Sequence, residues 1–215
     1  MEPNEQLQEA YIQYVLNHGE QPKTVYIFAK ENGIAEGEFY NHFGSFESIE
    51  QSIWSGLMAE TIKEVKAQEV WSQYSSREKA LSLFYSFIEL LKGKRSFVTF
   101  SFKNAESSIG LKRLLEGLNQ EFELFSAQII QEGIESGELM DRPFFASKYK
   151  DALWMQFKFV LSFWIKDTSA GFEKTDEAIE KGVNVTYNLF QRSPVDDLFE
   201  YGKFLFKNSG RKMPF

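Results

Sequence analysis

The sequence predicts an all-α protein with two parts, a small N-terminal head of three helices over about residues 1–52 and a larger helical body over about residues 53–215. Three observations lead to this prediction. Apolar residues recur at helical spacing along nearly the whole chain. No alternation of apolar and polar residues persists, so no strand is expected. Glycine, serine and proline interrupt the pattern at intervals typical of helix lengths.

The elements of the head follow from spacing and capping residues. One face of a first helix is formed by Leu7, Ala10, Tyr11, Tyr14 and Val15. Thr24 suits the N-cap of a second helix over about residues 25–32, and Gly33 suits the turn after it. A third helix is expected over about residues 35–41, and Ser45 suits the N-cap of a fourth. Two short helices joined by a glycine turn indicate a helix-turn-helix, a motif that lays its second helix in a DNA groove.

Beyond residue 55 the pattern stays helical. Helices are expected near residues 56–70, 77–92, 95–105, 109–136, 144–167, 174–191 and 195–207. Serine, glycine and proline fall at the breaks between these segments. The body is therefore expected to contain helices alone.

Composition excludes several kinds of chemical site. The chain is 43% hydrophobic, enough for a sizeable core, but it has no cysteine and two histidines, His18 and His42. Disulfides, thiolate metal sites and cysteine nucleophiles are therefore excluded, and a multi-histidine metal site is not expected. No carboxylates pair visibly in an apolar setting that would raise a pKa. We expect no catalytic residue, no metal and no cofactor, and a protein that is not an enzyme.

The chain shows no pattern of secretion or of membrane insertion. The segment MEPNEQLQEA at its start is acidic and polar, unlike a secretory signal. The most apolar stretch, residues 152–165, is interrupted by Gln156 and Lys158 and is shorter than the roughly 20 residues that a membrane span needs. We expect a cytoplasmic protein with no membrane span.

The tract GEFYNHFGSFESI, residues 37–49, is the most specific motif of the chain. It belongs to a set of positions with recognisable spacing: Thr24, Val25, Phe28, Ala29, Gly33, Ile34, Gly37, Phe39, Tyr40, His42, Phe43, Ser45, Glu47 and Ile49. Together these residues resemble the tetracycline-repressor-like (TetR) family of bacterial regulators. The resemblance implies a homodimer whose subunits each carry a three-helix DNA-binding head and a helical body. It also implies that a small molecule entering the body moves the two heads apart and releases the operator.

Carried over position by position, the resemblance implies DNA contacts from Thr24, Tyr26, Ala35, Glu36, Gly37, Glu38, Tyr40, Asn41, His42 and Phe46. The charges depart from the family's pattern, which usually has a basic residue in place of Glu36 and a small hydroxyl residue in place of Glu38. Residues 1–55 contain nine anions but only the cations Lys23 and Lys30, so the head alone accounts for the net charge of −7. Two explanations of the anions stay open: they stabilise the first turn of the helix, or Glu38 accepts a hydrogen bond from cytosine N4.

The helix expected near residues 144–167 is apolar around most of its circumference, which indicates burial from several sides. Packed with the next helix against their symmetry mates, it would form the four-helix interface of a two-fold dimer. The residues expected in that interface are Leu161, Trp164, Ile165, Ile179, Val183, Thr186 and Phe190. An ordinary monomer core is the alternative explanation of the same apolar faces.

Aromatic residues of the body predict a site for a hydrophobic or aromatic small molecule. Such a pocket is typically apolar with a few polar anchors. The candidate residues are Phe100, Asn104, Phe122, Phe125, Trp154 and Phe157. Aromatic core packing would explain the same residues.

These features favour a ligand-responsive DNA-binding transcriptional regulator. It is expected to be a repressor that a hydrophobic small molecule releases from a double-stranded DNA operator. The alternative is a protein of the same fold that binds a small molecule or lipid and has lost DNA binding. The sign of the charge on the head separates the two hypotheses, because phosphate contacts supply most non-specific affinity for DNA.

Overall fold

The computed structural model describes residues 2–105, 107–142, 146–191, 201–202, 204–205 and 207. Within these ranges the regular elements are helices, no strand is present, and the predicted all-α fold is confirmed. The α-helices are α1 (Pro3–His18), α2 (Val25–Glu31), α3 (Glu36–His42), α4 (Phe46–Lys66), α5 (Ser76–Lys92), α6 (Arg95–Asn104), α7 (Ser108–Leu114), α8 (Glu116–Glu135), α9 (Ala146–Lys166) and α10 (Glu173–Phe190). None of these helices is long and apolar enough to cross a lipid bilayer. Most of the helix expected over residues 195–207 lies outside the described residues.

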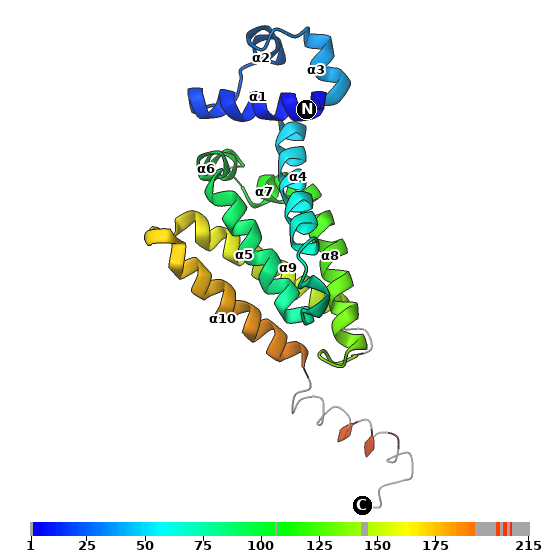
Figure 1. Cartoon of the computed structure of the whole chain (residues 1–215). Helices are drawn as coiled ribbons and strands as arrows, with labels where there is room; N and C mark the ends of the chain where they lie inside the picture. The colour runs from blue at the N-terminus through cyan, green and yellow to red at the C-terminus, as the bar shows by residue number, and fades with distance from the viewer. Residues whose placement is uncertain are drawn as a thin grey trace, which may run out of the picture.

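Helices α1, α2 and α3 form the head, which lies across the upper end of α4 (Figure 1). The head core is aromatic, because Tyr11, Phe28 and Phe39 are fully buried. Their rings pack with that of Phe46 at centroid distances of 5.5–6.3 Å, mostly edge to face. Aromatic pairs of this geometry contribute about 0.5–1.5 kcal/mol each beyond their burial. This packing gives a small head a defined shape.

Helix α4 joins the head to the body without a break. Ser45 caps it by accepting a hydrogen bond from the Ser48 N–H, and the chain then stays helical to Lys66. The helix packs on α1 in the head and on α5, α7 and α8 in the body. The expected domain boundary near residue 52 therefore falls inside a continuous helix, and the separate helix expected from residue 56 is part of α4. A rotation of α4 within the body would carry the head with it.

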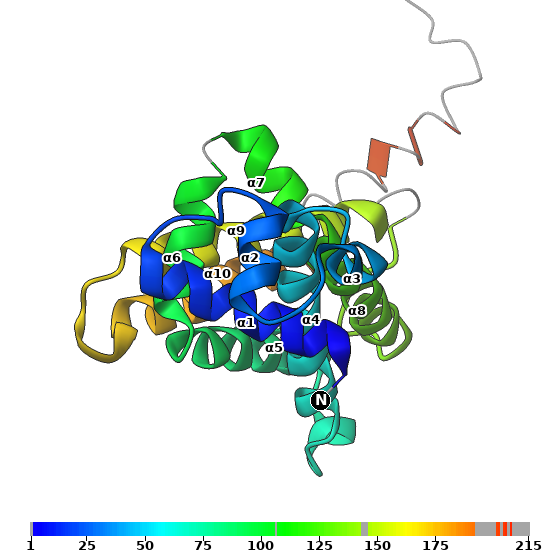
Figure 2. The ribbon, with the colours of Figure 1, turned by 90° about the horizontal axis from the view of Figure 1, so that it is seen from above.

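The body is a bundle of α5, α8, α9 and α10, with α6 and α7 between this bundle and the head (Figure 1). Figure 2 shows the head lying over the body helices. The interior of the bundle is filled by Phe84, Phe87, Phe122 and Phe157, each at most 2% exposed. Aromatic side chains from three helices, α5, α8 and α9, therefore meet in one core.

The segment expected as one helix over residues 109–136 is two helices. The backbone at Leu115 has φ −93° and ψ 9°, outside the helical range, so α7 ends at Leu114 and α8 begins at Glu116. The side chain of Gln51 in α4 donates a hydrogen bond to the Arg113 carbonyl at 3.0 Å. The bend lets α7 contact α4 near the head while α8 runs along α4.

The residues expected in a dimer interface lie inside the single chain. Ile165 is half-buried, and the other six are buried: Leu161, Trp164, Ile179, Val183, Thr186 and Phe190. Helices α9 and α10 pack against each other and against α5. Within the single chain these faces therefore form part of the core, and their contribution to a dimer interface stays a prediction. The physical reason is that the most apolar stripe of a helix is buried against its own chain.

Two glycines give a matched test of the packing of the body. A β-carbon at Gly133 in α8 would lie 2.8 Å from side-chain atoms of Leu139 and 2.9 Å from the Ser76 β-carbon. One at Gly56 in α4 would meet no described atom within 4 Å. We expect Gly133→Ala to lower the free energy of unfolding by about 1–3 kcal/mol through overpacking. Gly56→Ala should raise it by up to about 1 kcal/mol, because alanine favours the helix. Denaturant unfolding measures both, and equal effects would contradict the close contact at Gly133.

Candidate nucleic-acid interface and ligand site

The turn between α2 and α3 is built around Gly33. Its φ of 68° lies in the left-handed region that glycine favours. Beside it, Asn32 donates its side-chain N–H to the Phe28 carbonyl at 2.8 Å. At the start of α2, Thr24 accepts a hydrogen bond from the Ile27 N–H at 3.2 Å. Both ends of α2 are therefore held locally, and α2 and α3 form the short helix-turn-helix unit that the sequence predicts.

The positions of α3 opposite its buried residue carry no charge. Phe39 is buried in the head core. Since a helix turns by about 100° per residue, Gly37 and Asn41 point in the opposite direction, and both are exposed. Tyr40 is 53% exposed beside them, with its ring edge-on to Phe39 at 5.4 Å. Asn41 and Tyr40 present hydrogen-bonding groups of the kind that read base edges and phosphates.

The two anions of α3 flank this outward face. Glu38 lines a cavity of about 200 Å³ together with His42, and α1 and the α2–α3 turn form the other walls. Glu36 lies in the first turn of α3 and is exposed. A carboxylate there stabilises a helix by about 0.3–1 kcal/mol. Gly37 and Asn41 therefore lie opposite Phe39 without charge, and the exposed carboxylates of Glu36 and Glu38 lie beside them.

Most of the positions expected to contact DNA are accessible. Eight of the ten are exposed, and His42 and Phe46 are half-buried. On α2, Tyr26 is 57% exposed, one helical turn before the exposed Lys30. Lys23 is exposed immediately before the Thr24 cap. The two cations of the head are thus accessible on the same motif.

Phe46 packs in the head core. Its ring stacks on Tyr11 at 5.5 Å and meets Phe28 and Phe39 at steep angles, also at 5.5 Å. The expectation of a DNA contact here rested on its position in the family's motif. A phenyl ring is apolar and gains more from burial among other rings than from facing phosphates. The structure therefore places Phe46 among the residues that shape the head.

Three of the six expected ligand residues meet in one place. They belong to a group of five rings that we call the aromatic cluster: Phe84, Phe87, Phe122, Trp154 and Phe157. The ring centroids of the contacting pairs are 5.0–6.2 Å apart. Trp154 is half-buried at its edge and stacks on Phe157 at 5.6 Å. Because the rings fill the space between them, a ligand must displace at least one of them to enter.

The other three expected ligand residues lie apart from the aromatic cluster or at its margin. Phe125 is buried against Trp71, at 5.9 Å, beneath the Lys66 ammonium. Phe100 is half-buried on α6, and Asn104 is exposed at the C-terminal end of the same helix. The structure therefore does not bring all six residues to a single site.

Two lysines flank the exposed edge of the aromatic cluster. Lys150, Trp154 and Lys158 follow at four-residue spacing, so they share one face of α9. The Lys158 ammonium lies 5.6 Å from the centroid of the Trp154 ring. Lys158 is exposed and Lys150 is half-buried. An apolar interior with a cationic edge suits a ligand that has a hydrocarbon part and an anionic part.

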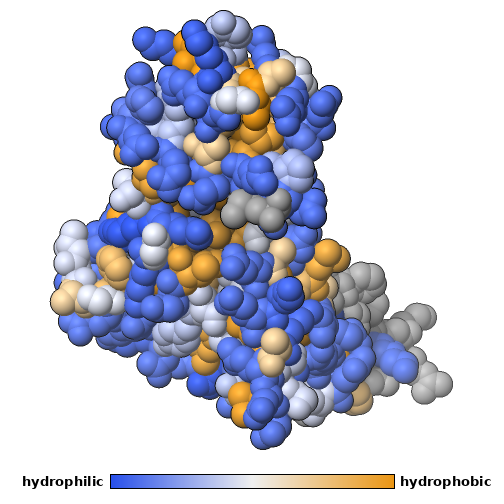
Figure 3. Space-filling model, turned by 45° about the horizontal axis from the view of Figure 1, so that its top comes forward, coloured by the Kyte–Doolittle hydropathy of each residue, from blue (hydrophilic) through white to orange (hydrophobic). Residues whose placement is uncertain are grey.

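A cavity of about 410 Å³ lies where the head meets the body. It is lined by Glu47 and Glu50 of α4, by Ser101 and Asn104 of α6, and by residues of α7 and of the α1–α2 loop. In the space-filling view, hydrophobic side chains show between the head and the body, surrounded by hydrophilic ones (Figure 3). The walls of this cavity therefore come from both parts of the chain.

Sequence reasoning missed the role of Glu50, which it counted among the anions of the head. Glu50 is 4% exposed. It accepts hydrogen bonds from the Tyr11 hydroxyl at 2.5 Å and from the Ser101 hydroxyl at 3.0 Å. The available signal was its spacing, because Glu50 shares a helix face with the buried Ile53 and Trp54.

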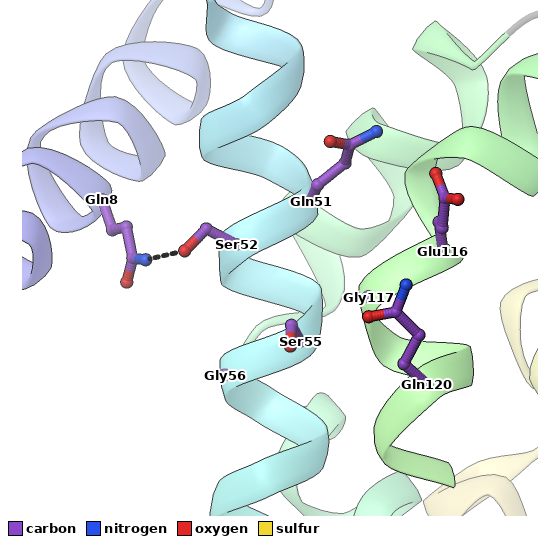
Figure 4. A pocket seen from close by; sticks show the side chains of 8 residues that line it. All are labelled: Gln8, Gln51, Ser52, Ser55, Gly56, Glu116, Gly117 and Gln120. Atoms are coloured by element: carbon purple, nitrogen blue, oxygen red, sulfur yellow. Dashed lines mark hydrogen bonds between the residues drawn. The ribbon is translucent and has the colours of Figure 1, made fainter. Parts of the chain in front are cut away.

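A second cavity, of about 490 Å³, lies between α1, α4 and α8 (Figure 4). Its walls carry amides and hydroxyls, and Gln8 donates a hydrogen bond across it to Ser52 at 2.8 Å. Gln51 and Gln120 add further amides. Burying a hydrocarbon chain against these amides and hydroxyls would leave polar groups without water, so this lining suits a polar group better than an apolar one.

Comparison with known families decides the identity of the chain. Residues 79–205, more than half of its length, match the family described as "Tetracyclin repressor-like, C-terminal domain". The chain belongs to the TetR family. It is thus a TetR-family transcriptional regulator, and the resemblance inferred from the head is confirmed by a match that lies in the body.

Known TetR-type proteins share this fold. The "Fatty acid metabolism regulator protein" of Bacillus subtilis strain 168 is 22% identical over 137 residues, which span 63% of this chain and 70% of that protein. The crystal structure of the regulator FadR from Bacillus subtilis in complex with stearoyl-CoA has a TM-score of 0.62 and 19% identity, and covers 83% of this chain and 96% of that one. The structure of a tetR family transcription regulator from Shewanella sp. PV-4 has a TM-score of 0.58 and 18% identity, and the match covers 90% of this chain and 100% of that one. At these identities the structural likeness shows a common fold.

The place of Phe46 in this TetR head can be tested by stability. We expect Phe46→Ala to lower the free energy of unfolding by at least about 2 kcal/mol, because it removes a partly buried ring from the head core. Tyr26→Ala, which removes an exposed ring, should change it by less than about 0.5 kcal/mol. Denaturant unfolding compares the two. Similar small losses for both variants would place Phe46 on the surface.

Proposed function

We propose that this TetR-family regulator is a cytoplasmic repressor that binds its operator as a dimer and releases it when a long-chain acyl-CoA enters the body. One observation carries the proposal: the interior of the bundle is apolar and aromatic, and two lysines flank its exposed edge. The named relatives add support, since one regulates fatty acid metabolism and a solved one holds stearoyl-CoA.

A long acyl chain would gain much from entering the bundle. Each buried methylene contributes about 0.8 kcal/mol, and the interior is lined by rings of α5, α8 and α9. In the structure these rings fill the interior, so the acyl chain must move one aside. Trp154 is the natural candidate, because it is the half-buried ring at the edge of the aromatic cluster.

The lysines would select the anionic end of the ligand. Coenzyme A carries several phosphate charges, and Lys150 and Lys158 are placed one turn to either side of Trp154. An exposed charge pair contributes about 0.2–1 kcal/mol. Two such contacts favour an acyl-CoA over an uncharged lipid of the same length without dominating its affinity.

Release of DNA would follow from a shift in population. An acyl-CoA that binds better to one arrangement of the body favours that arrangement. If the two heads of the dimer then no longer match half-sites about 34 Å apart, operator affinity falls. Helix α4 provides a continuous connection from the bundle to the head.

A second function is favoured by the charge of the head. With nine anions and two cations in residues 1–55, phosphate attraction is weak. A protein of this fold that binds acyl-CoA and has lost DNA binding would carry such a head at no functional cost. The two functions differ in one measurable property, binding to duplex DNA.

Fluorescence anisotropy with the genomic DNA that flanks its own gene, at low salt, tests the proposal. We expect binding below micromolar protein and release by stearoyl-CoA, but not by coenzyme A alone. The double variant Lys150→Ala with Lys158→Ala should weaken the binding of stearoyl-CoA roughly 2- to 30-fold, because two contacts of about 0.2–1 kcal/mol each are lost. It should leave DNA affinity unchanged, and Lys174→Ala on α10 serves as the matched control.

Each outcome of this titration separates the hypotheses. Stearoyl-CoA binding without any DNA binding at micromolar protein would favour the second function. DNA binding that stearoyl-CoA leaves unchanged would overturn the acyl-CoA response while keeping the regulator.

The dimer proposed here uses a different face of α9 and α10 from the one expected from the sequence. Four large apolar side chains are 54–67% exposed on these two helices: Met155, Phe159, Val185 and Leu189. Between them Gln156 lies directly over Gly182, so close that a β-carbon there would overlap the Gln156 amide. Exposed apolar side chains on two adjacent helices suit a two-fold four-helix interface with a second copy of the chain.

Introducing a charge on this face tests the dimer. We expect Phe159→Glu or Leu189→Glu to convert the dimer to a monomer, because each variant would bury like charges in the interface around the two-fold axis. Light scattering coupled to size-exclusion chromatography measures the change in mass. Leu124→Glu, on α8, is a matched control, since Leu124 is 71% exposed and lies on neither helix. A dimer that survives Phe159→Glu and Leu189→Glu but not Leu124→Glu would place the interface elsewhere.

A further inference from the structure

The carboxylate of Glu50 lies at the meeting point of three helices. It is 4% exposed on α4. Its Oε1 accepts the hydrogen bond from Tyr11 of α1, and its Oε2 accepts the one from Ser101 of α6. Tyr11 and Ser101 are both fully buried. Gln21 of the α1–α2 loop donates a further hydrogen bond to the Tyr11 hydroxyl at 3.0 Å.

This arrangement is costly to bury. Burial raises the pKa of the Glu50 carboxyl, while hydrogen bonding by Tyr11, Ser101 and Asn104 acts in the opposite direction. Burial, with the adjacent Glu50 charge, also raises the pKa of the Tyr11 phenol, which keeps it protonated as a donor. An ionisable group whose pKa is raised by burial opposes folding when it is charged. The hydrogen bonds from α1 and α6 offset this cost only while both helices stay in place around the carboxylate.

Helix α6 is held at its other end by the bundle. The Arg95 guanidinium donates hydrogen bonds to the carbonyls of Trp164, Ile165 and Asp167 at 2.9–3.1 Å. It also lies over the rings of Trp164 and Phe172, at 4.7 and 4.5 Å from their centroids. These carbonyls are at the end of α9 and just after it, next to α10. A displacement of α9 would therefore move α6, and α6 meets the head at Ser101.

We propose that Glu50 is a positioning residue whose buried carboxylate ties α1 of the head to α6 of the body and so sets the orientation of the head. The head stays in one orientation while both hydroxyl donors are engaged. A shift of α6 by one or two ångström breaks the Ser101 bond, since hydrogen-bond energy falls steeply with distance. The consequence for operator release rests on the proposed function, whereas the tie itself does not.

Distances between spin labels test the tie without DNA or ligand. The chain has no cysteine, so Lys30→Cys in the head and Ala127→Cys in the body, both exposed, take labels selectively. Doubly labelled protein diluted with unlabelled protein reports distances within one chain. We expect one narrow head–body distance distribution for the parent, and a distribution shifted by a few ångström or clearly broadened for Glu50→Gln. The melting temperature should stay unchanged or rise, because the variant removes a buried charge.

Controls separate positioning from other effects. Glu47→Gln, one turn earlier on α4 in the same cavity but exposed, should leave the distribution unchanged. A second pair within the head, Asn17→Cys with Lys30→Cys, should be insensitive to Glu50→Gln. If Glu50→Gln does not fold, Ser101→Ala removes one donor and should give the same shift.

Three results would overturn the proposal. The first is a distribution identical to the parent's in both Glu50→Gln and Ser101→Ala. The second is an equal change in Glu47→Gln, which would assign the effect to charge in the cavity. The third is a change in the within-head distance, which would make Glu50 part of the head's own core. Each of these is independent of whether the protein binds DNA or acyl-CoA.

Discussion

The buried Glu50 carboxylate, held by Tyr11 from one side and Ser101 from the other, is the contact on which the relation of head to body depends. Helix α4 makes the two parts continuous and packs on helices of both. The hydrogen bonds to Glu50 add a further connection by bringing α1 and α6 to the same carboxylate. Arg95 then connects α6 to the C-terminal end of α9. The middle of α9 contributes Trp154 and Phe157 to the aromatic cluster. A path of direct contacts thus runs from the bundle interior to the head.

The head as a whole is acidic, but the positions of α3 opposite its buried Phe39 carry no charge. The carboxylates of Glu36 and Glu38 lie beside this face, and Gly37 and Asn41 lie at its centre. With only Lys23 and Lys30 as cations in each head, the proposed operator binding would release few counterions and depend weakly on salt. Affinity would then come mainly from hydrogen bonds to bases and from the pairing of two heads on two half-sites. Such a regulator would bind non-specific DNA poorly.

Local patterns in the sequence predicted the helices well, and the partners of their faces less well. The Thr24 cap and the Gly33 turn follow from neighbouring residues, and the structure has both. Periodicity also found α9 and α10, but it selected their most apolar stripes, which the chain buries, and did not select the exposed Met155 and Phe159. The expected DNA contact of Phe46 came from its family position, whereas its apolar ring packs in the head core. Glu50 was missed because burial of a carboxylate depends on donors from distant helices, which one sequence does not reveal.

Hydrogen exchange along the whole chain, measured with and without stearoyl-CoA, tests most directly whether the bundle controls the head. We expect slower exchange in α8 and α9 around Phe122 and Phe157, where the acyl chain would be enclosed. In the same sample, exchange should become faster in α6 around Ser101 and in α1 around Tyr11, as the tie to Glu50 loosens. Slower exchange confined to the bundle, with α1 and the C-terminal half of α6 unchanged, would contradict this coupling.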